Sequence, residues 1–85
     1  MRRHPDALLS ELEDGSGVVV HLQRRRYHPL SKSGVHLWHA FDGGVDVDVD
    51  GLVVRLTQRY AIDEATARRD VVAFVDQLTR AEILL

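Results

Sequence analysis

The chain has 85 residues, of which 28% are charged and 45% hydrophobic, a composition typical of one small globular domain. It contains no cysteine, which excludes disulfide bonds and thiolate metal sites, and no apolar run approaches the ~18–20 residues of a membrane span, so we expect a soluble, cytoplasmic protein. The formal net charge of -2, with a basic excess confined to residues 24–32, argues against a protein that binds nucleic acid by neutralising phosphates.

The first third of the chain has the pattern of a small antiparallel sheet. Three stretches of strand-forming residues are bounded by turns: 8–13, 18–22 and 26–30. The turns are residues 14–17, which contain two glycines, and residues 23–25. Pro29 has no N–H to donate, so we expect the third stretch to be an edge strand or to end there.

The hydrophobic period then changes to that of helices. Ser31 is the predicted N-cap of a first helix that residues 42–44 end, Asp48 or Asp50 caps a second helix, and Asp63 caps a third, with Glu64 in its first turn. The apolar stripes of the three helices are Gly34, Val35, Leu37, Trp38 and Phe41; Leu52, Val53, Leu56 and Tyr60; and Ala67, Val71, Phe74, Val75 and Leu78. Residues 83–85 are apolar and are expected to fold back onto the sheet.

Three strands followed by three helices predict an α+β fold in which the helices and one small sheet share a core. A hairpin beside a cluster of three helices has the shape of a winged helix-turn-helix domain. We expect a single domain over residues 1–85 with a flexible N-terminus over residues 1–7, and the sequence has no internal repeat.

Two groups of residues have partial metal-binding patterns. Residues 46–51 place carboxylates at positions 1, 3 and 5 of an EF-hand loop and glycine at position 6, but position 12 is Thr57 instead of glutamate. His36 and His39 lie three residues apart on the first predicted helix, without a third ligand at a fixed spacing. We therefore expect a solvated loop that caps the second helix, two histidines on the polar or half-buried side of the first, and no metal or other cofactor.

No set of residues typical of catalysis is present. The serines lie in predicted turns or caps, and there is neither a nucleophile elbow nor a glycine-rich phosphate loop followed by lysine. We expect a protein that binds a partner, not an enzyme.

Two binding functions remain open. In a winged helix the third helix would enter the major groove of DNA, but here residues 64–80 contain as many carboxylates as arginines, and carboxylates oppose phosphates. The other function is capture of an extended peptide, which would add to the open edge of the third strand through its main chain. Alternate side chains of such a peptide would enter the space between that strand and the third helix.

The peptide interpretation identifies candidate site residues on both elements. On the third strand and the turn before it they are Arg25, Arg26, Tyr27, His28, Pro29 and Leu30. On the third helix they lie beside the apolar stripe: Arg69, Val72, Ala73, Asp76 and Arg80. This mixture of charged and small apolar groups suits a peptide better than a phosphate backbone, and Arg24 and Arg25 can steer an acidic peptide. The alternative is that the helix residues form only a solvated face.

Short motifs spread over residues 8–85 occur in the order known from one family. They are Gly17-Val18-Val19-Val20, Arg26-Tyr27, Leu30-Ser31, Gly34, Leu37-Trp38, Phe41-Asp42-Gly43, Tyr60-Ala61-Ile62-Asp63, Asp70-Val71, Phe74, Leu78 and Ile83-Leu84. In these motifs the chain resembles PqqD and the RiPP recognition elements, the leader-peptide-binding domains of pathways that make ribosomal peptide natural products. It departs from the family at Ser31, which is usually Asn, at Glu82, which is usually Gly, and at the aspartate run, which replaces a Thr at the start of the second helix.

The resemblance implies a winged-helix-like domain, without catalysis or cofactor of its own, that binds the leader of a precursor peptide. It implies that the leader adds to the third strand, packs against the third helix, and is delivered to a tailoring enzyme or a leader protease. A stand-alone chain with Arg26-Tyr27 looks most like the leader-binding partner of lasso peptide clusters, whose partners would be a leader peptidase and an ATP-dependent macrolactam synthetase. A PqqD that presents its precursor to a radical SAM enzyme is the alternative. An open edge also permits a monomer or an edge-paired or domain-swapped dimer.

Overall fold

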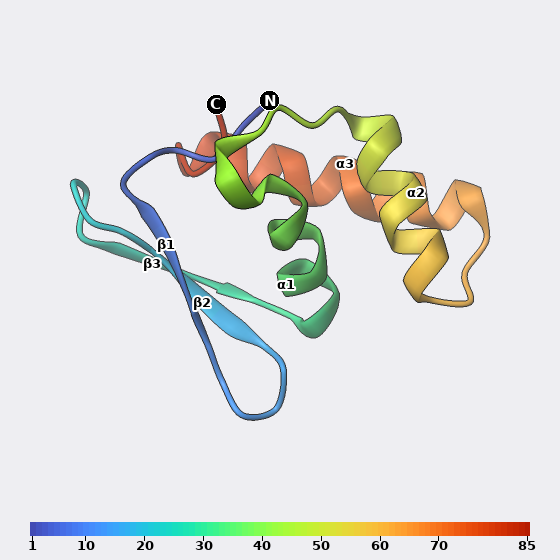
Figure 1. The fold of residues 1–85 in the computed structure, drawn as a ribbon, viewed down its shortest axis with the longest axis horizontal. Coiled ribbons are helices and arrows are strands. Elements are labelled where there is room, and N and C mark those ends of the chain that lie inside the picture. The colour runs from blue at the N-terminus through green and yellow to red at the C-terminus, as the bar shows by residue number, and fades with distance from the viewer.

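The computed structural model describes every residue from Met1 to Leu85. Its elements are β1 (Ala7–Glu11), β2 (Gly17–His21), β3 (Arg26–Leu30), α1 (Lys32–Trp38), the 3-10 helix η1 (His39–Gly44), α2 (Val49–Arg59) and α3 (Glu64–Arg80). The strands form one antiparallel sheet in the order β1-β2-β3 (Figure 1). The predicted α+β fold of three strands followed by three helices is thus confirmed. No helix combines the length and the apolar character that a membrane span requires.

Each α-helix begins at a residue whose side chain accepts a hydrogen bond from an N–H group of the first turn. The acceptor and donor pairs are Ser31 with Gly34 at 3.2 Å, Asp48 with Gly51 at 2.7 Å, and Asp63 with Thr66 at 3.2 Å. Of the two candidates for the cap of α2, Asp48 therefore has this role, and Asp50 lies in the first turn. These caps satisfy N–H groups that the helix itself leaves without a partner, which is why the sequence locates all three helix starts.

The first helix is shorter than predicted. α1 ends at Trp38, and the chain continues as η1, inside which Asp42 leaves helical geometry with a ψ of 138°. Gly43 and Gly44 then have φ angles of 80° and 73°, which glycine adopts without steric cost. Residues 42–44 end the helical run, as predicted.

The core lies between the sheet and the helices. Its largest fully buried side chains come from parts of the chain far apart in sequence: Trp38, Phe41, Leu52, Leu78 and Leu84. On α3, Ala67, Val71 and Leu78 of the predicted stripe are buried. Phe74 and Val75 of that stripe are only half-buried, so the buried face of α3 is narrower than the sequence pattern suggests.

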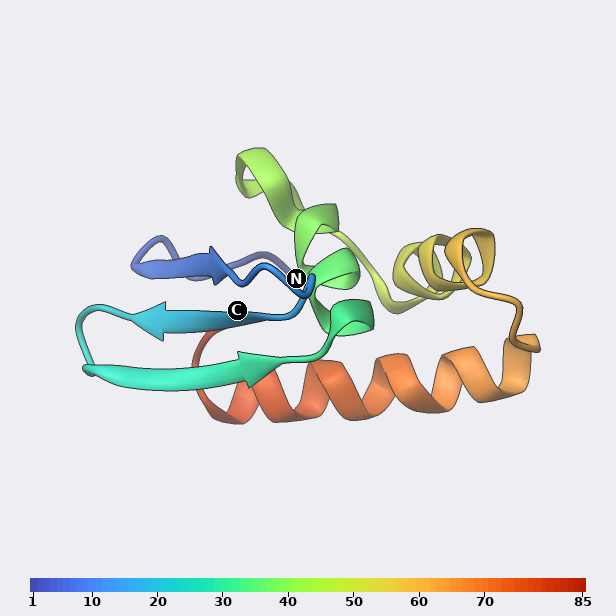
Figure 2. The ribbon, with the colours of Figure 1, turned by 90° about the horizontal axis from the view of Figure 1, so that it is seen from below.

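The long helix α3 lies beside β3, the strand at one edge of the sheet (Figure 2). The chain direction of α3 brings its C-terminal end toward the turn between β2 and β3, and its middle toward the end of β3 (Figure 2). β1 forms the opposite edge of the sheet. The arrangement places one free strand edge next to one face of a helix.

The two ends of the chain pair with each other (Figure 1). Arg2 and Leu85 exchange main-chain hydrogen bonds of 3.0 and 2.7 Å, and the His4 N–H donates to the Ile83 carbonyl at 2.7 Å. The sequence predicts a flexible segment over residues 1–7. In the structure, residues 2–4 of this segment lie against the C-terminal segment, because Ile83 and Leu84 enter the core and bring the last residues beside the first.

An ion pair joins the turn before β3 to the residue that follows the C-cap of α3. Arg24 in that turn pairs with Glu82. Glu82 has a φ of 58°, a left-handed conformation that costs a non-glycine residue about 1–2 kcal/mol. Both side chains are about half exposed, so the pair contributes at most about 1 kcal/mol. The backbone cost at Glu82 is therefore at least as large as the benefit of the ion pair.

We expect Glu82→Gly to stabilise the fold by about 1 kcal/mol, because glycine removes the left-handed strain and only a surface ion pair is lost. For a domain of this size the midpoint of thermal unfolding should rise by about 4–8 °C. Glu82→Ala is the matched control: it keeps the strain and loses the pair, so its midpoint should fall slightly. A lower midpoint for Glu82→Gly than for Glu82→Ala would contradict the assignment of strain to this residue.

Candidate functional site

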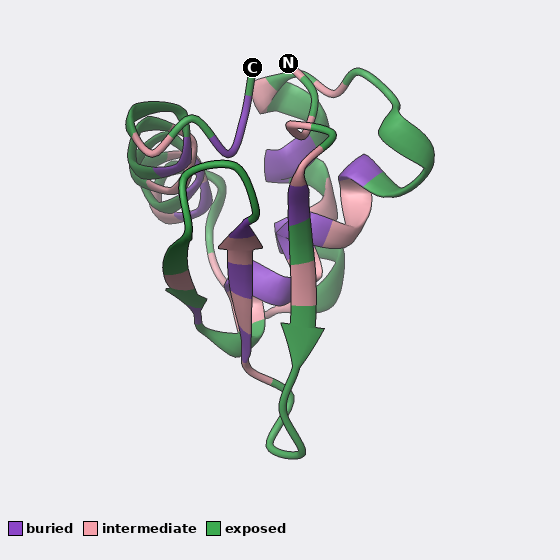
Figure 3. Cartoon of the chain, turned by 90° about the vertical axis from the view of Figure 1, so that its left-hand side faces the viewer, coloured by how far each residue is buried: buried purple, intermediate pink, exposed green.

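β3 has one main-chain edge that no other strand covers. It pairs with β2 on one side only, from Arg26 opposite His21 to Leu30 opposite Gly17. Four of its five residues are exposed or half-buried, and only Leu30 is buried (Figure 3). The predicted edge strand is therefore present, and its free side lies toward α3.

The alternation of hydrogen bonds in the sheet identifies the residues of β2 that bond to β3. At the two ends of the β1–β2 pair, the Leu12 N–H donates to the Ser16 carbonyl at 2.8 Å and the Leu22 N–H donates to the Asp6 carbonyl at 3.0 Å. Bonded and non-bonded pairs alternate along an antiparallel ladder. The even-numbered residues of β2 therefore bond to β1, and its odd-numbered residues bond to β3.

On β3 this alternation directs the main chain of Tyr27 and Pro29 away from β2. Val19 bonds to its partner His28, so the neighbours of His28 on either side face the open edge. The free groups are the N–H and C=O of Tyr27 and the C=O of Pro29. The missing N–H of Pro29 removes no hydrogen bond from the ladder, which explains how a proline fits within this strand.

A cleft of about 260 Å³ lies between the end of β3 and α3. Its strand side is formed by Pro29 and Leu30, and its α3 side by Asp70, Ala73, Phe74 and Gln77. Ser31, Ser33 and Gly34 at the start of α1, with Leu37 and Leu56, complete the lining. Apolar and polar residues both line the cleft, and at Pro29 it borders the free edge of β3.

Of the five α3 residues that the sequence suggests, only Ala73 lines this cleft. Arg69 is exposed and lies outside it, and Val72, which is 51% exposed, also lies outside it. Arg80 forms an ion pair of 3.1 Å with Asp76 on the same helix, and neither lines the cleft. Of the predicted set, only Ala73 is therefore brought to this cleft, and a role of the other four residues in binding a leader stays a prediction.

The difference between the predicted set and the lining of the cleft has a geometric reason. A helix turns by about 100° per residue, so an apolar stripe has two flanks, and periodicity alone does not show which flank faces the strand. Asp70 and Gln77, which the sequence-based set omits, precede the buried Val71 and Leu78 and lie on the flank that the tertiary structure turns toward β3. Each stands directly before a residue of the apolar stripe, as Ala73 stands before Phe74. This position is the sequence signal for the flank of α3 that faces β3.

The strand residues divide between two faces of the sheet. Tyr27 is 75% exposed and lies in register with Val20 and Leu8, in a row across the face that points away from the helices. Leu30 points to the opposite face and is buried. Tyr27 therefore presents its main chain to the cleft side, not its ring. Arg25 has a φ of 54° in the turn, and its side chain is exposed.

The three aspartates of the EF-hand-like segment have separate partners. Asp46 lies 3.7 Å from the N-terminal amino group, Asp48 caps α2, and Asp50 forms an ion pair of 2.9 Å with Arg68. Their carboxylates therefore do not converge on one point. The segment is a loop that ends in a helix cap, which is the simpler of the two interpretations of its sequence.

His36 and His39 also have separate partners. The two ring nitrogens of His39 each lie 3.0 Å from a carboxylate oxygen, one of Glu11 and one of Asp42. His36 Nε2 lies 3.3 Å from the carbonyl oxygen of Arg55. The hydrogen bond to Glu11, followed by that to Asp42, raises the pKa of His39 above its ordinary value of 6.5, against the opposing effect of burial. His39 thus links β1 to η1.

The surface of α3 is not uniformly basic. Arg68 pairs with Asp50 and Glu64, and Arg80 pairs with Asp76. Arginines that are already neutralised by carboxylates contribute little to binding a phosphate backbone. The charge distribution of this helix is therefore unfavourable for the DNA-binding alternative.

Comparison with known proteins agrees with this geometry. A family model described as coenzyme PQQ synthesis protein D (PqqD) matches residues 16–84. A solved structure described as "TbiB1 in Complex with the TbiA(beta) Leader Peptide" has a TM-score of 0.84 and 24% identity over 99% of this chain and 94% of that chain. Another, "Lasso peptide synthetase B1 complexed with the leader peptide", has a TM-score of 0.79 and 20% identity over 99% and 95% of the two chains. No curated protein sequence matches the chain significantly.

The raised pKa of His39 predicts a pH-dependent contribution to stability. The contribution is fully present below the ordinary value of 6.5 and is lost as the pH rises through the raised pKa of the folded state. Wild type and His39→Gln should be compared by urea denaturation at several values between about pH 6 and pH 9. The free energy of unfolding of wild type should fall relative to that of the variant as the pH rises. A difference that does not vary with pH would show that the imidazolium does not bridge Glu11 and Asp42.

Proposed function

The chain belongs to the PqqD family, and we propose that it is a non-catalytic, cytoplasmic adaptor that binds the leader of a ribosomally synthesised precursor peptide. The observation that supports this most directly is the free edge of β3 beside a cleft whose other wall is α3. An unpaired strand edge beside a cleft that can take side chains is the arrangement in which a sheet takes up an extended peptide. Both similar solved structures are complexes with a leader peptide.

In the proposed complex the leader forms a fourth strand next to β3. Its main chain bonds to the N–H and C=O of Tyr27 and to the C=O of Pro29. Side chains alternate along a strand, so every second leader residue points into the cleft between Leu30 and Ala73. Asp70 and Gln77 at the margin can bond to polar groups of the leader.

The adaptor then delivers the bound precursor to processing enzymes. In a lasso peptide pathway these are a leader peptidase and an ATP-dependent macrolactam synthetase, the assignment that the lasso peptide synthetase structure favours. The description of the family model favours the second possibility, a PqqD that presents its precursor to a radical SAM enzyme. Both possibilities use the same cleft. Without leader, the open edge allows a monomer or an edge-paired or domain-swapped dimer, and an edge-paired dimer would compete with the leader for β3.

The first test is a titration with a fluorescent leader peptide from the precursor gene next to the gene for this chain. We expect binding between about 10 nM and low micromolar, or about -11 to -8 kcal/mol. Ala73→Arg and Ala73→Glu should each weaken it by about tenfold or more, because either side chain occupies space that the leader needs. The two variants carry opposite charges, so a loss of affinity in both shows a steric effect and not electrostatic attraction or repulsion of the leader.

Val72→Arg and Val72→Glu are the matched controls, because Val72 is the neighbouring exposed residue and lies outside the cleft. They should change the affinity by less than about twofold. A larger effect at Val72 than at Ala73 would move the site to the other flank of α3. Absence of binding by wild type at tens of micromolar would rule out the proposed function.

Strand addition makes a separate prediction about the leader. N-methyl groups placed one at a time along its main chain should weaken binding by about tenfold at the two residues that donate to the Tyr27 and Pro29 carbonyls. These residues are two apart, and methylation of the residue between them should have little effect, because its N–H points away from β3. The measurement is a competition titration with each methylated peptide. Equal tolerance at all three positions would show that the leader does not bind as a strand.

A further inference from the structure

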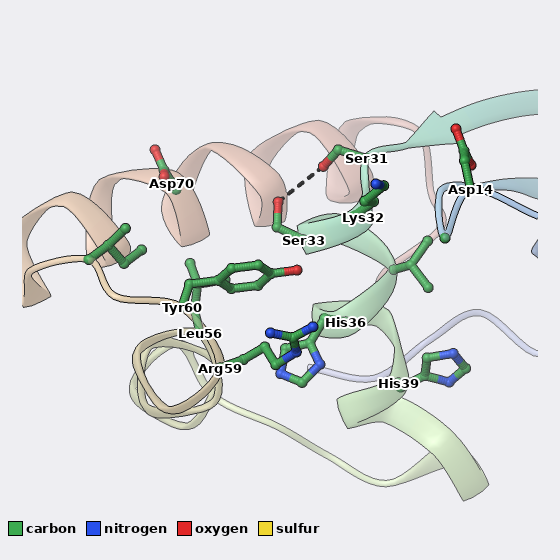
Figure 4. A pocket seen from close by; sticks show the side chains of 13 residues that line it. Asp14, Ser31, Lys32, Ser33, His36, His39, Leu56, Arg59, Tyr60 and Asp70 are labelled. Atoms are coloured by element: carbon green, nitrogen blue, oxygen red, sulfur yellow. Dashed lines mark hydrogen bonds between the residues drawn. The ribbon is translucent and has the colours of Figure 1, made fainter.

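A second and larger hollow adjoins the cleft. It has a volume of about 850 Å³ and lies between the start of α1 and the end of α2 (Figure 4). We call it the α1–α2 pocket; the residues that define it are Lys32, Val35, His36, Arg59, Tyr60 and Ile62. It shares Ser31, Ser33, Leu56 and Asp70 with the cleft between β3 and α3, so the two hollows are neighbours. The proposed strand site does not use this pocket.

The length of β3 requires a place for the rest of a bound leader. β3 has five residues, which span about 17 Å and pair with a peptide segment of similar length. At the Arg26 end, the ion pair of Arg24 with Glu82 joins the turn to the end of α3. At the Leu30 end, Ser33 and Asp70 line both the cleft and the α1–α2 pocket, and no ion pair spans the two. A longer peptide can therefore continue into the pocket at the Leu30 end.

The direction of β3 determines which flank of the leader reaches the pocket. All strand pairs in this sheet are antiparallel, and β3 runs from Arg26 to Leu30. A leader that continues the antiparallel pattern has the N-terminal end of its paired segment beside Leu30. The residues N-terminal to that segment are then the ones that enter the pocket.

The lining of the pocket indicates the chemistry of those residues. Its floor contains the buried side chains of Val35 and Leu56, and the half-buried Tyr60 ring and Ile62 lie beside them. The Tyr60 ring extends from the end of α2 toward α1, and its hydroxyl has no hydrogen-bond partner in the protein (Figure 4). The pocket is open to solvent on one side, so a bound side chain would lie against this floor without being fully enclosed. An aromatic or large aliphatic side chain fits this floor.

Two cations at the margin form no ion pair, although the pKa of Asp14, which the hydrogen bonds from Ser16 lower, is lowered further by Lys32. Arg59 lies with its guanidinium 5.1 Å from the centre of the Tyr60 ring and forms no ion pair, and the exposed Lys32 forms none. The carboxylates on the lining are Asp14, whose Oδ1 accepts hydrogen bonds from Ser16, and Asp70, which stands where the two hollows meet. Lys32 and Arg59 can therefore bind carbonyl or carboxylate oxygens of a peptide that crosses the pocket.

We propose that the α1–α2 pocket is a second subsite for the leader, which takes an aromatic or large aliphatic side chain from the segment N-terminal to the paired strand, with Lys32 and Arg59 bound to oxygens of that segment. This inference rests on the proposed function, since it needs a leader in the cleft. It divides recognition into two parts: main-chain pairing at β3, which tolerates many sequences, and side-chain selection in the pocket.

The test compares the full leader with a leader that lacks the residues N-terminal to its paired segment, which the N-methyl scan locates. For wild type, the truncated peptide should bind at least about tenfold more weakly than the full leader. For Arg59→Glu the two peptides should differ by less than about threefold, while the affinity of the truncated peptide stays at the wild-type value. Arg2→Glu is the matched control, since Arg2 is exposed, forms no ion pair and lines neither hollow. It should retain the wild-type difference.

The outcomes separate this inference from the proposed function. If neither peptide binds wild type, the proposed function falls. If both bind wild type equally, or if Arg59→Glu leaves their difference unchanged, the second subsite is refuted while the strand site stands. If Arg59→Glu reduces only the capture of a processing enzyme, the pocket is an enzyme-binding surface and the inference is likewise refuted. Should Arg59→Glu unfold, a benzophenone amino acid in place of Tyr60 should crosslink to the N-terminal flank of the leader; crosslinks confined to other parts of the leader would refute the subsite.

Discussion

The unpaired main-chain edge of β3 is the constraint on which the proposed site depends. Main-chain N–H and C=O groups need partners, and the N–H and C=O of Tyr27 and the C=O of Pro29 face neither β2 nor any other strand. α3 lies beside this edge (Figure 2), and a helix satisfies its own main chain internally, so it cannot bond to the edge. A helix beside an edge strand therefore leaves the edge open while it supplies a wall of side chains. A peptide that brings its own main chain can use both.

The position of that wall follows from how α3 packs. The buried Ala67, Val71 and Leu78 set the rotation of α3 about its axis, and this rotation turns Ala73 and Gln77 toward β3. The ion pair of Arg24 and Glu82 joins the turn before β3 to the C-terminal end of α3. At the Leu30 end of β3, the cleft adjoins the α1–α2 pocket instead. A peptide bound along β3 can therefore extend beyond the Leu30 end, whereas the ion pair stands at the Arg26 end. Glu82, which forms this ion pair, has a strained left-handed φ at a position where the family usually has glycine.

Local signals explain what could be predicted. The caps Ser31 and Asp63 and the glycines at 43 and 44 act through atoms a few residues away, so sequence spacing was enough to locate the helix boundaries they set. Pro29 marked β3 as an edge for the same reason, since its missing N–H affects only its own ladder position. The choice between Asp48 and Asp50 depended on contacts that spacing does not contain, and so did the pairing of residues 2–4 with the C-terminus.

The sequence by itself determined the order of strands and helices, the α+β class, the open third strand and the family resemblance, because each depends on periodicity or on short motifs. It did not determine which flank of α3 faces β3: Val72 and Ala73 are adjacent in sequence, yet only Ala73 reaches the cleft. It also gave no sign of the α1–α2 pocket, whose residues come from the first turn, α1, α2 and α3. Such features arise only when helices pack, since the rotation of a helix and the space between two elements are properties of the whole core.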